Sequence, residues 1–154
     1  MQGLTGTYFL RLTVEYGGKL HSSNQYWLST KPETLDWKKS TWYYTPTQSF
    51  ADYTALKQLQ QVKLNVTNTT EHPGNEDVTH VTVENPSKAL AFFVKVKVNK
   101  GNGGEVLPIF YEDNYFSLLP GEKREISARY RSSDLAGATP AVEVSGWNVE
   151  PVVQ

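Results

Sequence analysis

The sequence predicts an all-β fold, an immunoglobulin-like antiparallel β-sandwich of about eight strands with one long aromatic-rich loop excursion. Several short segments alternate apolar and polar residues with the period of two that a half-buried strand requires. Turn-forming Gly, Pro and Asn residues separate these segments, and no segment has the periodicity of a convincing helix. The length of 154 residues suits one domain, so we expect a single sandwich over 1–154.

The first predicted strand is YFLRLTVEY, which runs from Tyr8 to Tyr16 and alternates apolar residues with Arg, Thr and Glu. Gly17 and Gly18 follow it, and a glycine pair suits the positive φ angles of a hairpin turn. A second strand is expected after this turn, near 21–29. The chain therefore begins with a predicted β-hairpin.

Residues 30–59 form the predicted excursion, because they have no sustained period. The segment contains two of the four tryptophans, a composition that is not typical of a disordered linker. We therefore expect it to be ordered, with one or two helical turns at 52–59.

The remaining predicted strands lie in the second half of the chain. The clearest is LAFFVKVKVN, in which one face is apolar and is expected to be core; its residues are Leu90, Phe92, Val94, Val96 and Val98. VKLNVTN from Val62 and VTHVTVEN from Val78 precede it, separated by the turn-rich TEHPGNED. Further strands are expected at YFSLL, at 123–130 after the Pro120-Gly121 turn, and at 141–147.

Composition excludes several classes of function. The net charge is −1 and the basic residues are scattered, so the chain lacks the basic surface of a nucleic-acid-binding protein. Its apolar runs are far shorter than the roughly 20 residues that span a bilayer, and the N-terminal MQGLTGTYFLRL does not resemble a signal peptide. There is no cysteine, and hence no disulfide, thiolate metal cluster or cysteine nucleophile. We expect neither a nucleic-acid nor a membrane partner.

The stretch YEDNYFSLLPGEKREI is the best candidate for catalysis because it contains four carboxylates, Glu112, Asp113, Glu122 and Glu125. Adjacent residues of an extended segment point to opposite faces, whereas glycoside hydrolysis needs two carboxyl groups on either side of one bond. The three histidines have no metal-binding spacing, and the glycine-rich KGNGGE lies between strands and not before a helix. We predict no catalytic residue, metal or cofactor, and interpret this stretch as scaffold.

The aromatic residues are the remaining functional candidates, chiefly Trp37, Trp42, Tyr43 and Tyr44 of the excursion. Exposed aromatic rings in a row could stack on sugar rings, which would suit a carbohydrate-binding module. The alternative, which we favour, is packing in the core or against another domain, where Trp and Tyr dominate interface energetics. Burial of these rings in a structure would discriminate between the two.

Several separate motifs, in order, resemble one known domain type. They are SSNQYWLST, STWYYTP, ADYTALKQL, VENPSKALAFFVKVKV, VLPIFYEDNYFSLLPGEKREI and VSGWNVE. Together they resemble the C-terminal immunoglobulin-like domain of exo-β-D-glucosaminidases and of related β-mannosidases, including mannosylglycoprotein endo-β-mannosidase, in glycoside hydrolase family 2. The likeness runs from about Tyr8 to Val149.

This resemblance implies that the chain is excised from the C-terminal part of a larger retaining glycosidase acting on β-glucosaminides or β-mannosides, whose catalytic glutamates lie in a separate barrel. A barrel needs about 250 residues, so this chain cannot contain one. The expected role is a non-catalytic accessory domain that packs against its neighbours and shapes one edge of the substrate cleft. The alternatives are an autonomous carbohydrate-binding module and a free-standing adhesion domain.

The resemblance also gives the expected contact residues and location. Besides the four aromatic residues of the excursion, Asp113, Asn114 and Tyr115 are candidates for contact with carbohydrate or with other domains of the parent glycosidase, and they are also expected to fix the preceding loop. The parent is expected to be periplasmic or secreted, by analogy with enzymes that act on polysaccharides.

Overall fold

The computed structural model describes residues 4 and 6–154. The chain divides into two compact units, residues 1–59 and 60–154, and each is described separately below. The described residues form strands, turns and short 3₁₀ helices, with no α-helix among them.

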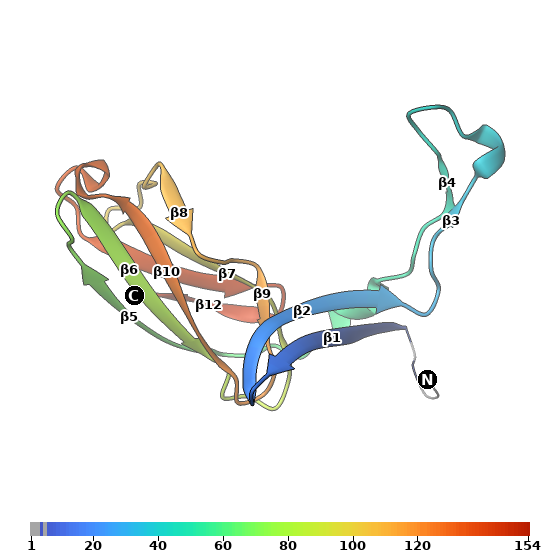
Figure 1. The fold of residues 1–154 in the computed structure, drawn as a ribbon, viewed down its shortest axis with the longest axis horizontal. Coiled ribbons are helices and arrows are strands. Elements are labelled where there is room, and N and C mark those ends of the chain that lie inside the picture. Colours follow the sequence, from blue (N-terminus) through green and yellow to red (C-terminus); the bar gives the residue numbers. More distant parts are fainter. Residues whose placement is uncertain (1–3, 5) are drawn as a thin grey trace. The chain divides into compact units, whose positions relative to one another are not determined.

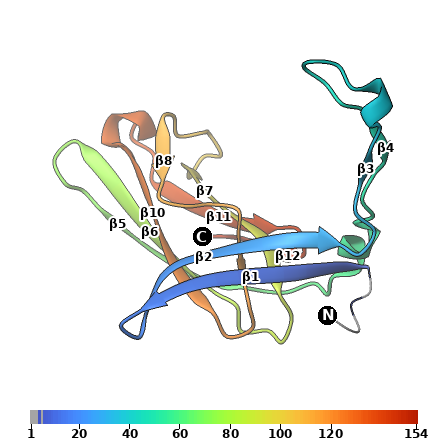
Figure 2. The ribbon, with the colours of Figure 1, turned by 45° about the vertical axis from the view of Figure 1, so that its right-hand side comes forward.

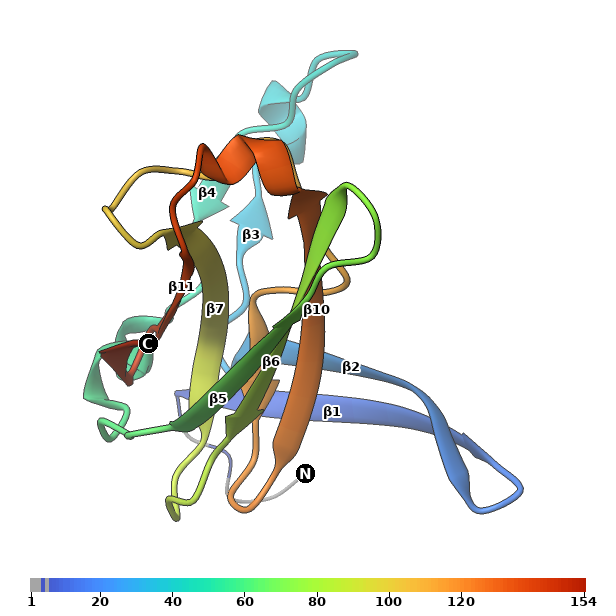
Figure 3. The same cartoon turned by 90° about the vertical axis from the view of Figure 1, so that its left-hand side faces the viewer.

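The second unit is an antiparallel β-sandwich of eight strands in two four-stranded sheets. One sheet has the order β5 (Asn65–Glu71), β6 (Glu76–Glu84), β10 (Lys123–Arg131) and β8 (Ile109–Tyr111). The other has the order β12 (Val149–Val153), β11 (Pro140–Gly146), β7 (Ala91–Lys100) and β9 (Phe116–Leu118). Figure 3 shows the two layers, with β6 and β10 in one and β7 and β11 in the other. The prediction of an all-β sandwich is confirmed.

The core lies between these two sheets and is built by alternation along the strands. On β7, Val94, Val96 and Val98 are buried, as the period of two predicts. On β10, the predicted inward residues Ile126, Ala128 and Tyr130 are also buried. All members of the core cluster lie between Val62 and Val149.

The first unit contains two small two-stranded sheets, whose paired strands run side by side in Figure 1. β1 (Thr7–Tyr16) and β2 (Lys19–Ser29) form a hairpin, and β3 (Thr34–Leu35) pairs with β4 (Thr47–Ser49). Gly17 and Gly18 have positive φ angles of 59° and 73°, as the predicted hairpin turn requires. The excursion is ordered, with 3₁₀ helices η1 (Trp37–Lys39) and η2 (Thr54–Gln58), the second at the predicted helical turn.

The eight sandwich strands are not the eight that the sequence predicted. The prediction placed the first hairpin in a sandwich over 1–154, whereas β1 and β2 form a sheet of their own and the sandwich strands run from Asn65 to Val153. The sandwich instead contains β8 and β12, two strands that were not predicted. β8 has only three residues, too few to show alternation, and β12 contains Pro151, which usually argues against a strand. β12 accommodates Pro151 because it lies at the edge of its sheet.

Candidate functional site

Four exposed aromatic residues lie on an arm formed by residues 34–49, called here the aromatic arm. β3 and β4 run side by side along it, and the chain reverses between them through η1 and a loop (Figures 1 and 2). The four predicted contact residues, Trp37, Trp42, Tyr43 and Tyr44, all lie in this reversal and are called here the aromatic tip. The structure therefore brings these four predicted residues together.

Local hydrogen bonds hold the arm. The backbone N–H of Asp36 donates to the carbonyl oxygen of Pro46 at 2.8 Å, and the N–H of Thr41 donates to the carbonyl oxygen of Tyr44 at 2.8 Å. The hydroxyl groups of Thr34 and Ser49 lie 2.6 Å apart, across the two strands. These hydrogen bonds join residues within the arm, so they hold its shape without a hydrophobic core.

The rings of the aromatic tip point into solvent in this chain. The exposed fractions are 94% for Trp42, 73% for Tyr43, 72% for Trp37 and 59% for Tyr44. Burial in the core of this chain, one part of the interpretation favoured from the sequence, is therefore wrong for these residues, whereas docking on another domain and sugar stacking both stay open. The rings of Trp42 and Tyr43 have centroids 5.0 Å apart and planes 69° apart, so this pair does not form one flat platform.

The second predicted group, Asp113, Asn114 and Tyr115, lies in the loop between β8 and β9. The carboxamide of Asn114 accepts a hydrogen bond from the N–H of Val96 at 2.8 Å and donates one to the carbonyl oxygen of Val96 at 2.7 Å. The carboxylate of Asp113 forms an ion pair with Arg124. These bonds fix the loop against β7 and β10.

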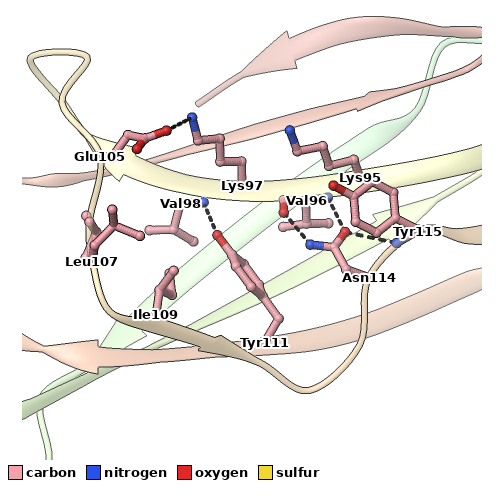
Figure 4. Close-up of a pocket in the computed structure, with 11 residues that line it drawn as sticks. Lys95, Val96, Lys97, Val98, Glu105, Leu107, Ile109, Tyr111, Asn114 and Tyr115 are labelled. Atoms are coloured by element: carbon pink, nitrogen blue, oxygen red, sulfur yellow. Dashed lines mark hydrogen bonds and ion pairs between the residues drawn. The ribbon is translucent and has the colours of Figure 1, made fainter.

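A groove of about 360 Å³ runs beside this loop, and Figure 4 shows the residues that line it. Tyr111 lies across it, and its hydroxyl accepts a hydrogen bond from the N–H of Val98 at 2.9 Å. Burial raises the pKa of Tyr111 above its ordinary value, so it remains a neutral phenol at physiological pH. The Nζ of Lys97 lies 3.1 Å from Oε1 of Glu105. The main polar groups of the groove are thus engaged within the protein, which favours a structural role.

The carboxylates of YEDNYFSLLPGEKREI also have local structural partners. Glu112 accepts a hydrogen bond from the hydroxyl of Ser127 at 3.0 Å, and Glu122 accepts one from the N–H of Leu119 at 2.8 Å, across the Pro120-Gly121 turn. Glu125 lies 3.7 Å from His80. Glu122 therefore braces its own turn, whereas Glu112 and Glu125 contact residues of neighbouring strands, as expected of scaffold.

Two buried asparagines, whose side-chain hydrogen bonds were not predicted from the sequence, are important to the sandwich. Asn148 accepts a hydrogen bond from the N–H of Phe92 at 2.8 Å and donates two at 2.7 Å, to the carbonyl oxygens of Gln60 and Leu90. Asn85 donates to the carbonyl oxygens of Ala89 and Leu118. Both sit in segments with other turn residues, so the sequence offered no signal that distinguished them.

Among residue 4 and residues 6–154, no group of three or more His, Asp or Glu side chains could hold a metal ion. None of the helices described there is long and apolar enough to cross a membrane.

The chain therefore combines an immunoglobulin-fold sandwich within residues 60–154 with the aromatic arm of residues 34–49. The chain belongs to the family of exo-β-D-glucosaminidase Ig-fold domains, whose family model matches residues 42–149. The family resemblance noted in the sequence is thereby confirmed.

Several relatives carry this domain within much longer chains. The exo-β-D-glucosaminidase of Streptomyces avermitilis is 42% identical over 152 residues, which are 96% of this chain and 17% of the relative. A crystal structure of the Amycolatopsis orientalis exo-chitosanase CsxA has a TM-score of 0.93 at 40% identity, covering 99% of this chain and 18% of that one. A mannosylglycoprotein endo-β-mannosidase of Lilium longiflorum is more distant, 33% identical over 85 residues, 51% of this chain and 9% of the relative. This chain thus spans less than a fifth of these relatives.

Proposed function

We propose that this chain is a non-catalytic accessory domain of an exo-β-D-glucosaminidase, and that its aromatic tip docks on the catalytic part of the same polypeptide at the edge of the substrate cleft. The observation that supports this most directly is the exposure of Trp42 and its neighbours on an arm that is internally hydrogen-bonded. The similarity to exo-β-D-glucosaminidases several times longer than this chain supports the identity of the parent.

The aromatic tip exposes apolar surface to solvent. Burying one large aromatic side chain contributes about 1.5–3 kcal/mol, and contiguous exposed aromatic groups mark interaction sites more often than free surface. Trp and Tyr are enriched at such interfaces because their rings bury a large area while the polar end finds a partner. A braced arm also loses little conformational entropy on docking, which favours a defined contact.

The test replaces Trp42 in the full-length parent enzyme. We expect Trp42→Ala to lower the thermal midpoint and to raise KM for chitosan oligomers by about tenfold, the equivalent of roughly 1.4 kcal/mol. The matched control is Phe110→Ala, which removes another exposed ring, 70% accessible, from β8. Unchanged stability and unchanged kinetics in Trp42→Ala would contradict the proposal.

A second candidate is an autonomous carbohydrate-binding module, which the 94% exposure of Trp42 favours. In that case, chitosan, mannan or cellulose oligomers at millimolar concentration should change the tryptophan fluorescence of the isolated chain, and Trp42→Ala should abolish the change. An unchanged spectrum would exclude this candidate and leave docking on the parent.

We further propose that the parent is periplasmic or secreted, because its expected polysaccharide substrates lie outside the cell. Fractionation of source cells followed by immunoblotting with antiserum against this chain checks this. A band confined to the cytosol would contradict it.

A further inference from the structure

Two lysines accompany the aromatic tip. Lys38 and Lys39 follow Trp37 in η1, and both are exposed. The side chain of Lys39 is 77% exposed, and its Nζ lies 3.3 Å from Oδ2 of Asp36, whose side chain is 22% exposed. Asp36 is the only carboxylate of the aromatic arm, so the reversal over 37–44 contains two positive charges and no negative one.

This charge limits what the aromatic tip can contact. Aromatic rings attract cations to their faces, so an ammonium group such as that of a glucosaminide would suit the rings alone. Two lysines beside the rings oppose a cationic ligand and favour an anionic one. At physiological ionic strength the effect is screened beyond about 8 Å, so it acts on groups that contact the tip. The tip therefore suits a surface that carries carboxylates better than it suits a chain of amino sugars.

The composition of the reversal is that of a protein interface. Such interfaces have a core enriched in Trp and Tyr and a polar rim, and Lys is depleted from the core. Here four exposed aromatic residues and two lysines lie within eight consecutive positions, 37–44. An enzyme that binds amino sugars needs negative charge at its substrate cleft, because the electrostatic potentials of binding partners are complementary. The edge of such a cleft is where a cationic rim would meet carboxylates.

We propose that the surface on which the aromatic tip docks is acidic, and that Lys38 and Lys39 pair there with Asp or Glu side chains of the catalytic part of the same polypeptide. In this arrangement the aromatic rings form the centre of the contact and the two lysines form its rim. This inference rests on the proposed docking of the tip and adds the chemistry of the surface that receives it.

The experiment is carbodiimide cross-linking of the full-length parent, followed by mass spectrometry of the digested protein. Carbodiimide forms an amide bond between a lysine amine and a carboxylate that are in contact. The internal positive control is Lys97 with Glu105, whose Nζ and Oε1 lie 3.1 Å apart. The matched negative control is Lys88, which is exposed in a bend of the second unit.

We expect Lys38 or Lys39 to form amides with Asp or Glu residues outside 1–154 of the same polypeptide, with a yield at least fivefold above that of the negative control. An amide between Lys39 and Asp36 alone, in a sample where the positive control reacts, would overturn the proposal. A covalent dimer would also overturn it, in favour of a second copy of the chain.

Charge reversal gives a second measurement. We expect Lys38→Glu to lower the thermal midpoint of the parent at low ionic strength, and this deficit to shrink by at least half in about 1 M NaCl, where the Debye length is about 3 Å. Lys88→Glu should change the midpoint little. If Lys38→Glu left the midpoint unchanged but lowered KM for chitosan oligomers, Lys38 would face the cationic substrate, and the proposal would be wrong.

The Trp42→Ala variant separates this inference from the proposed function. If Trp42→Ala lowers the thermal midpoint and raises KM while the cross-links are absent, the docking stands and only the acidic surface is refuted. If Trp42→Ala has no effect and the cross-links are also absent, the docking itself is refuted.

Discussion

At the scale of single residues, Asp77 is a carboxylate buried at the start of β6. Its Oδ1 lies 2.9 Å from Nδ1 of His72 and accepts a hydrogen bond from the hydroxyl of Ser132. Burial raises the pKa of Asp77, but the hydrogen bonds from Ser132 and His72, together with the charge of His72, outweigh burial and leave the pKa below its ordinary value of 3.8. The ionised carboxylate thus ties the 72–77 turn to Ser132, the residue that follows β10.

This lowered pKa predicts a pH dependence of stability. The unfolded state binds a proton at Asp77 more readily than the folded state, so the stabilisation is present above about pH 5 and is lost as pH falls through the lowered folded pKa. We expect Asp77→Asn to lower the thermal midpoint at pH 7 and the deficit to shrink toward pH 3. Calorimetry across this range measures the difference.

The matched control for Asp77→Asn is Glu76→Gln, the neighbouring carboxylate, which is exposed. It should change the midpoint little at either pH. A deficit in Asp77→Asn that is equal at pH 7 and pH 3 would show that the charge of Asp77 does not stabilise the fold.

The residues of the candidate site could be predicted from the sequence more readily than their environment. The unusual concentration of aromatic residues between 37 and 44 identified the aromatic tip, but composition does not say whether a ring is buried. The roles of Asn114 and Asn148 depend on backbone groups 18 and 56 residues away. No local pattern encodes such long-range partners, so they could not be predicted.

At the scale of elements, β7 illustrates how side chains can replace a missing strand. Its edge pairs with β9 at Ala91 and Val94 and forms an isolated bridge between Asn99 and Glu105. Between these points, both backbone groups of Val96 bond to the carboxamide of Asn114. An open strand edge is an aggregation hazard, and here a side chain covers part of it.

We therefore expect Asn114→Ala to lower the free energy of unfolding by about 1–3 kcal/mol, because it leaves two backbone groups of β7 without their partner. Denaturant titration measures this. Asn75→Ala is the control, since it removes the same atoms from an exposed turn. Equal stability of the two variants would indicate that water replaces the carboxamide at no cost.

Strands were predictable where alternation runs long enough. β7, β10 and β11 lie within a few residues of their predicted ranges, because each has at least seven residues with one buried face. The hairpin of β1 and β2 was also predicted, but its place in the architecture was not. A period of two says that one face is apolar and does not say which sheet covers it.

At the scale of the whole molecule, the two units differ in what they can bury. The core cluster lies entirely within residues 62–149, whereas among the described residues of 1–59 only Leu56 is a buried hydrophobic residue. A sandwich of this kind needs about 100 residues, close to the length of 60–154. The second unit therefore has a hydrophobic core of its own, as an independent fold requires. The described residues of the first unit bury too little apolar surface to form such a core.

This difference predicts how the chain behaves when it is divided after Leu59. We expect residues 60–154 alone to unfold in one cooperative transition in denaturant, because all eight sandwich strands and their core are present. Residues 1–59 alone should show no cooperative transition, since a hairpin and an arm without a core do not offset their conformational entropy. Circular dichroism with urea titration checks both fragments. A cooperative transition in 1–59 would contradict this account.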